Sequence, residues 1–225
     1  MLQNDDSEKP PRGRFLGRFG RLPMLESAAN ALHSTHAAND ALFMAYDLIA
    51  AVDLGSNSFR LQVGRVVGNQ IYPLDSLKDS VRLAAGLKVD KQLDAAAQAR
   101  GIEALARYGE RLRGFEAGAV RAVGTNTLRV AKNAASFLQR AEVALGFPIE
   151  IIAGREEARL IYLGVAHTLP NPKRQSLVVD IGGGSTEFII GRQFQPAQLE
   201  SLYMGCVSYS LRYFSYGNVD KRQMN

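Results

Sequence analysis

Short apolar runs alternate along this chain with longer segments in which apolar residues recur every three or four positions. Three β-rich runs come first and predict strands at 48–53, 58–66 and about 70–77. Five later runs predict further strands at 119–123, 149–152, 176–181, 185–191 and about 197–204. The helical period predicts helices at about 90–113, 127–144, 155–167 and 206–215. This mixture of strands and helices predicts an α/β fold.

The starts of two helices carry more specific expectations. Asp90 is predicted to cap the first helix, and Gly109 to weaken its end. Thr125 and Asn126 are predicted to cap the helix at 127–144. Arg129 would then lie in its first turn, where a cation opposes the helix dipole. That placement indicates an anionic partner, or else an ordinary surface arginine.

One segment of the chain occurs twice. Residues 52–65 return as residues 179–192, and Val, Asp, Gly, Ser, Gly and Arg recur at matching positions. Each copy is predicted to form a strand, a tight Gly/Ser turn next to an aspartate (Asp53 or Asp180), and a second strand. Such a turn exposes N–H groups to an anion, and the aspartate can hold a metal ion or a water. We therefore expect two related halves that face each other, with phosphate between the turns.

The predicted elements divide the chain into three parts. Residues 1–45 show no sustained period and are predicted to be a flexible extension. Residues 46–170 form the first half of the repeat, and the Pro-rich stretch at 170–173 forms a linker. Residues 171–225 begin the second half but hold fewer elements than the first. We therefore expect a second half that is truncated.

Charge and cysteine content narrow the class of protein only modestly. Cys206 is the single cysteine, which excludes an internal disulfide and fits a reducing cytoplasm. No apolar run approaches the roughly 20 residues of a membrane helix. The net charge of +5 suits a polyanionic substrate, but it also fits a normal surface. By itself it does not predict binding to nucleic acid.

The two turns are the strongest candidates for phosphate binding. In the first, Gly55 allows close approach of an anion, and Ser56, Asn57 and Ser58 offer donors. The alternative is a plain hairpin turn. In the second, Gly182, Gly183 and Gly184 precede Ser185. Three consecutive glycines are costly in chain entropy, and a backbone wrapped around phosphate is their simplest explanation.

Two acids at a predicted helix start, Glu156 and Glu157, allow two interpretations. They stabilise the helix through its dipole, or one of them orients an attacking water. The chain contains no GxxxxGK[ST] motif and shows no apparent Ser-His-Asp or Cys-His set. Metal-assisted attack of water on a bound phosphate is the chemistry that these parts support.

Five ordered motifs resemble those of the exopolyphosphatase/guanosine pentaphosphate phosphohydrolase family. They are DLGSNS at 53–58, VRL at 81–83, RAVGTNTLR at 121–129, IAGREEAR at 152–159 and DIGGGSTE at 180–187. The segment GCVS at 205–208 is also similar. The resemblance implies the actin/Hsp70/sugar-kinase fold, in which two ribonuclease-H-like subdomains enclose a cleft. The first subdomain would be complete here and the second incomplete.

The resemblance also implies roles for particular residues. Glu157 would be the general base for the attacking water. Asp180 and Glu187 would be catalytic acids that bind Mg²⁺ or position water and phosphate. Phosphate would be bound by Arg129 and by the two turns at 55–58 and 182–185.

The implied substrate is inorganic polyphosphate or guanosine pentaphosphate, and nothing in the chain separates the two. Full-length relatives are implied to form homodimers. Two rival interpretations stay open. One is a nucleotide-binding kinase or ATPase of the same fold, and the other is a non-catalytic phosphate binder. The absence of the remaining second half leads us to expect weak activity or none.

Overall fold

A computed structural model describes residues 46–214, except residue 69 and residues 170–172. The predicted extension at 1–45 lies outside the described residues. The elements of the first part are β1 (Leu48–Leu54), β2 (Phe59–Val67), β3 (Gln70–Asp79), η1 (Leu83–Gly86), α3 (Ala95–Arg111), η2 (Ala117–Ala119), β4 (Val120–Gly124), α4 (Asn126–Val130), α5 (Ala134–Leu145) and β5 (Ile149–Ile151). The later elements are α6 (Gly154–Thr168), β6 (Gln175–Ile181), β7 (Thr186–Arg192), β8 (Gln195–Leu202) and α7 (Cys206–Tyr213).

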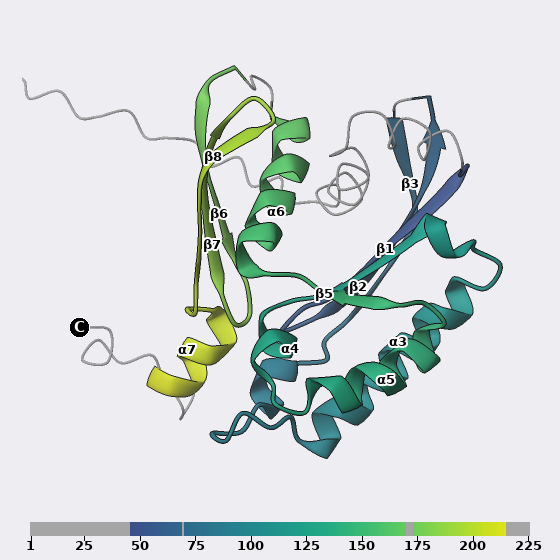
Figure 1. Cartoon of the computed structure of the whole chain (residues 1–225), viewed down its shortest axis with the longest axis vertical. Helices are drawn as coiled ribbons and strands as arrows, with labels where there is room; N and C mark the ends of the chain where they lie inside the picture. Colours follow the sequence, from purple (N-terminus) through teal and green to yellow (C-terminus); the bar gives the residue numbers. More distant parts are fainter. Residues whose placement is uncertain (1–45, 69, 170–172, 215–225) are drawn as a thin grey trace, which may run out of the picture.

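The first sheet has five strands in the order β3-β2-β1-β4-β5. β1, β2 and β3 form an antiparallel meander, and β4 and β5 extend the sheet in parallel with β1. Helices α3 and α5 lie side by side along one face of this sheet (Figure 1). Asp53 and Arg60, on the opposite face, line the cleft described below.

The first core fills the space between this sheet and its two helices. Phe59 and Leu61 of β2 are fully buried there, as are Tyr108 of α3 and Phe137 of α5. The Tyr108 hydroxyl donates to the Phe59 carbonyl at 3.0 Å, so its polar end is satisfied. Along β2, the apolar residues Phe59, Leu61 and Val63 alternate with other residues, which places them on one face because successive side chains point to opposite faces.

Gly109 lies in the last turn of α3, and its predicted weakening of the helix end stays a prediction. A Cβ there would lie 2.6 Å from the Ala144 carbonyl oxygen of α5. The glycine therefore permits α3 and α5 to approach each other closely.

The second sheet has three antiparallel strands in the order β6-β7-β8. Helix α6 covers one face, where Ala158, Tyr162 and Ile189 form a small core (Figure 1). The apolar side chains Leu177, Val179 and Ile181 of β6 lie on the other face. They are 63%, 43% and 68% exposed. One face of the second sheet is thus packed and the other is not.

The predicted cap of the first helix is wrong. Asp94 rather than Asp90 caps α3, and its carboxylate accepts from the Ala97 amide. Asp90 instead accepts from the Gln92 amide in a turn, where Lys91 has a left-handed φ of 65°. The chain between these aspartates forms a tight loop, so the helix begins later than its period predicts.

The helix predicted at 127–144 is two helices, α4 and α5. The chain is extended at Ala131, and the side chain of Asn133 accepts from the Leu93 amide and donates to the Leu93 carbonyl. These bonds tie the break to the loop before α3. A tertiary contact of this kind has no periodic signal in the sequence.

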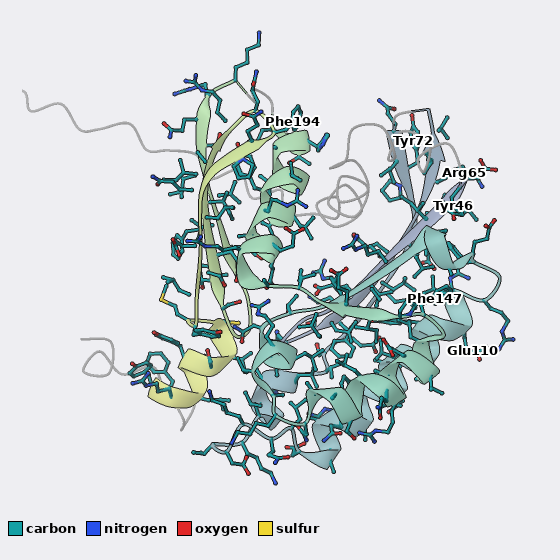
Figure 2. All side chains as sticks on the ribbon, viewed as in Figure 1. Tyr46, Arg65, Tyr72, Glu110, Phe147 and Phe194 are labelled. Atoms are coloured by element: carbon teal, nitrogen blue, oxygen red, sulfur yellow. The ribbon has the colours of Figure 1, made fainter. Side chains whose placement is uncertain are left out.

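Helix α6 packs against β7 and β8 rather than against the first sheet. The predicted boundary between residues 170 and 171 stays a prediction. Helix α6 precedes this boundary in the chain but packs against strands that follow it. At the far end of α6, Phe194 lies near the helix terminus (Figure 2), and its ring centroid is 4.6 Å from that of His167. No helix among the described residues is long and apolar enough to cross a membrane.

Candidate functional site

A polar cleft of about 250 Å³ lies where the two sheets meet. The two predicted phosphate turns contribute much of its lining. The residues that line it from these turns are Gly55, Ser56, Asn57, Ser58, Gly182, Gly183, Gly184 and Ser185. Asp53, Glu157 and Asp180 also line the cleft, together with the cations Arg60 and Lys78. The fold therefore brings together residues that are more than 120 positions apart in the chain.

The two turns pack directly against each other. A Cβ at Gly183 would lie 2.9 Å from the Asn57 amide nitrogen, and one at Gly184 would lie 2.9 Å from the Ser56 Oγ. A side chain at either position would separate the two turns. Close packing between the turns is therefore a second reason for the consecutive glycines, besides the predicted contact with phosphate.

Both turns accept backbone hydrogen bonds from the start of a following helix. The carbonyls of Ser56 and Asn57 accept from the start of η1, and those of Gly182 and Gly183 accept from the start of α7. In a trans peptide the N–H of the next residue points opposite to the carbonyl. The amides of Asn57, Ser58, Gly183 and Gly184 are thus directed away from these helices. They form an arrangement suited to anions.

The hydroxyl of Ser56 is engaged within the protein. Its Oγ accepts from the amide of Thr127 at 3.2 Å and from the Thr127 hydroxyl at 2.7 Å. Ser56 therefore satisfies the start of α4 from another element. The predicted capping of this helix by the side chains of Thr125 and Asn126 is wrong. Thr125 occupies the N-cap position without a side-chain cap bond, and Asn126 lies inside the helix.

Strand register places the two repeated aspartates next to different partners. Asp53 pairs with Arg60, which pairs with Lys78 on the next strand. Asp180 pairs with Glu187, which pairs with Ser201. Residues that are directly opposite in neighbouring strands share one face. One wall of the cleft is therefore partly cationic, and the facing wall is acidic.

Burial raises the pKa of several of these acids. Desolvation raises the pKa of Asp53 to about 7 against the opposing effect of Arg60, and nearby Asp180 raises it further. Desolvation also raises the pKa of Glu157 to about 7, and Glu187 and Asp53 add to this effect. The pKa values of Asp180 and Glu187 are likewise raised, mainly by desolvation. Such a cluster of like charges favours a bound cation or proton.

Arg129 lies against Glu157. Its Nη1 donates to Glu157 Oε2 at 2.7 Å and to the Ile152 carbonyl at 2.9 Å. The two side chains are 14% and 15% exposed, so solvent screens the pair only weakly. Arg129 does not oppose the helix dipole as predicted, because α4 has only five residues and Arg129 also lies in its last turn. Its anionic partner within the protein is Glu157.

The neighbouring acid, Glu156, behaves differently. Both of its carboxylate oxygens accept from Arg159, three residues along the same helix, at 2.7 and 2.8 Å. That bond lowers the pKa of Glu156. Glu156 thus has the helix-stabilising role, whereas Glu157 faces the cleft.

Arg60, Lys78 and Ser201 contribute to the site but were not among the predicted site residues. Arg60 and Lys78 line the cleft because strand register aligns them with Asp53. Ser201 donates to Glu187 Oε1 at 2.8 Å. The short turn between β1 and β2 sets the register that places Arg60 opposite Asp53, so that signal was present in the sequence. The pairing of β8 with β7, which positions Ser201, was not predictable at the level of single residues.

Within the residues that the structure describes, no three Asp, Glu, His or Cys side chains converge as a metal-binding group. Mg²⁺ is commonly bound by only one or two carboxylates, with waters and substrate phosphates completing its shell. The hard oxygen donors Asp180 and Glu187 lie next to each other in register and fit that mode.

The sequence profile of the Ppx/GppA phosphatase family matches residues 62–225 of the chain. A Haemophilus influenzae protein with the provisional name of exopolyphosphatase is 50% identical over 169 residues. The match covers 75% of this chain and 52% of that protein. The chain therefore spans about half the length of this relative.

Two solved structures are similar over comparable portions. The PPX-GPPA enzyme of Aquifex aeolicus is 31% identical with a TM-score of 0.64, and the match covers 74% of this chain and 55% of that one. An exopolyphosphatase from Cytophaga hutchinsonii is 29% identical with a TM-score of 0.69, with 77% and 54% covered. The predicted fold class, α/β with the actin-like arrangement, is confirmed by these likenesses.

Proposed function

Because this chain belongs to the Ppx/GppA phosphatase family, we propose that its cleft releases terminal phosphate from inorganic polyphosphate by attack of water. The observation that carries this proposal is that the two Gly/Ser turns lie against each other and line the same cleft. Asp53, Glu157 and Asp180 line this cleft as well. Phosphoryl transfer depends chiefly on positioning and electrostatic stabilisation. Two converging sets of amides and nearby carboxylates suit both needs.

Glu157 is the proposed general base. Its carboxylate lines the cleft, and a pKa of about 7 lets it accept a proton from water near neutral pH. The bond from Arg129 leaves one carboxylate oxygen, Oε1, for that water. Arg129 is therefore proposed to hold Glu157 in place, besides the contact with phosphate that the sequence predicts.

The turns at 55–58 and 182–185 are proposed to bind the terminal phosphate through backbone amides and hydroxyls. Arg60 and Lys78, on the cationic wall, would contact outer phosphates of a longer anion. Asp180 and Glu187 would hold Mg²⁺. When bound, this ion would neutralise negative charge on the phosphate oxygens.

Two wider predictions accompany this function. The resemblance implies homodimers for full-length relatives. The single cysteine fits the reducing environment of the cytoplasm. Guanosine pentaphosphate stays an alternative substrate, because it presents a similar terminal phosphate. The non-enzymatic alternative is a protein that binds phosphate without hydrolysing the substrate.

The test is release of phosphate by the purified 225-residue chain from long-chain polyphosphate with Mg²⁺. Parallel reactions contain guanosine pentaphosphate at the same concentration of terminal phosphate groups. Faster release from polyphosphate supports the proposal, and faster release from the nucleotide assigns the alternative substrate. Binding of polyphosphate without release from either would identify a binder and reject the hydrolase.

A further inference from the structure

Ser201 is the residue opposite Glu187 in the β7–β8 pairing. Its hydroxyl donates to Glu187 Oε1 at 2.8 Å. Glu187 is only 1% exposed, and a buried carboxylate requires donors close by. The hydroxyl of Ser185, in the second turn, also favours the charged form of Glu187. Glu187 is therefore held between the phosphate turn and β8.

Gly154 leaves room for the Ser201 side chain. A Cβ at Gly154 would lie 2.7 Å from Ser201 Oγ and 2.8 Å from Ser201 Cβ. The same Cβ would lie 3.6 Å from Arg129 Nη2. Gly154 is the first residue of α6, three positions before Glu157. The start of α6 thus packs between the partner of Glu157 and the partner of Glu187.

We propose that Ser201 is a positioning residue that fixes the orientation of the Glu187 carboxylate, and that Gly154 provides the space this requires. The inference rests on the proposed function, since Glu187 is one of its acids. Ser201 does not line the cleft and acts through Glu187. The Ser185 hydroxyl still favours the charged form of Glu187 when Ser201 is removed, so the carboxylate gains freedom to rotate without losing all stabilisation.

The first experiment compares Ser201→Ala with Ser176→Ala, the same change on β6 of the same sheet. We expect kcat for phosphate release to fall about 10-fold in Ser201→Ala, with KM within about twofold of the unchanged protein. Ser176→Ala should leave both constants unchanged. A kcat for Ser201→Ala equal to that of the unchanged protein would overturn the inference. So would an equal loss in both variants, which would indicate a general effect of sheet stability.

The second experiment tests the role of Gly154 with a double-mutant cycle. Gly154→Ala should displace the Ser201 hydroxyl and lower kcat. If both changes act through the bond to Glu187, then adding Ser201→Ala to Gly154→Ala should cost less than its effect alone. If the loss in kcat of the double variant equals the product of the two single losses, the two residues do not act through the same bond to Glu187. If Gly154→Ala fails to fold, the single variant Ser201→Ala still decides the question.

A crystal structure of Ser201→Ala separates this inference from the proposed function. A changed or divided conformation of the Glu187 side chain, relative to the unchanged protein, supports positioning by Ser201. An unmoved Glu187 overturns it. This comparison needs no turnover, so it stands even if the unchanged protein releases no phosphate and the proposed function fails.

Discussion

The two copies of the repeat have the same hairpin but different surroundings. In the first copy, Val52 and Leu61 point into the core beneath α3 and α5 and are fully buried. At the matching positions of the second copy, Val179 is 43% exposed and Phe188 is half-buried. The same pattern of residues therefore yields a packed face in one copy and an open face in the other. Burial depends on what lies against a sheet, not on the sheet alone.

The cleft faces of the copies differ in charge. Position 60 in the first copy is arginine, and the matching position 187 in the second copy is glutamate. Arg60 and Lys78 are exposed at the wall of the cleft, whereas Glu187 is buried and accepts from the Ser201 hydroxyl. An anion in the cleft would meet Arg60 and Lys78 on one side and Asp180 on the other. This asymmetry suits a site that binds phosphate and also activates water.

The largest expected effect concerns the helix that joins the two copies. Glu157→Gln removes the proposed base and should lower kcat about 1,000-fold, because general bases contribute roughly 10²–10⁴. Glu156→Gln is the matched control, since that side chain bonds to Arg159 outside the cleft. Its expected loss is below about threefold. Phosphate release by the two variants measures the difference, and similar losses would reject the assignment of Glu157.

The charge asymmetry of the copies is tested at one repeat position. Glu187→Gln should lower kcat about 100-fold, because an acid at the reacting end is lost. Arg60→Gln should instead raise KM about 5-fold with little change in kcat, because a contact with an outer phosphate is lost. Steady-state kinetics with polyphosphate separates these outcomes. If both variants changed the same constant, the two walls would not have distinct roles.

A third prediction uses the raised pKa of Asp53. A folded-state pKa of about 7, above the ordinary value of 3.8, means that the folded protein binds more protons between these pH values. The free energy of unfolding should therefore fall as pH rises from about 4 to about 7. Asp53→Asn should remove about 2 kcal/mol of this decline, because the amide does not ionise.

Denaturant unfolding at pH 5 and pH 8 measures this effect. Glu103→Gln, a change of an exposed acid on α3, serves as the control. An unchanged slope in Asp53→Asn would show that Asp53 is not the group that titrates. The other raised acids, Glu157 among them, should preserve a weaker decline.

The smallest expected effect compares burial at one repeat position. Val52→Ala removes two buried methyl groups and should lower the free energy of unfolding by about 2 kcal/mol. Val179→Ala should change it by less than about 0.5 kcal/mol, because that side chain already contacts solvent. Urea unfolding of both variants is the measurement. Equal losses would show that the open face of the second sheet is covered in solution.

Much of the architecture was predictable from local pattern. The strands of both copies and the turns between them follow from alternation and glycine chemistry, because these signals act within a few residues. The motifs also identified the acids that the fold brings to the cleft. Helix ends were less predictable, as Asp90 and the break after Val130 show. Each depends on a bond to a distant segment, and such bonds leave no period in the sequence.

The sequence alone identified the candidate site residues, since the repeated turns and the acids near them are visible in the order of residues. Only the tertiary structure decided how these residues are paired. It joined Arg129 to Glu157 and Ser201 to Glu187, and it set Gly183 and Gly184 against the first turn. The physical reason is that backbone pattern is local, whereas the partner of a side chain depends on packing between elements far apart in the chain.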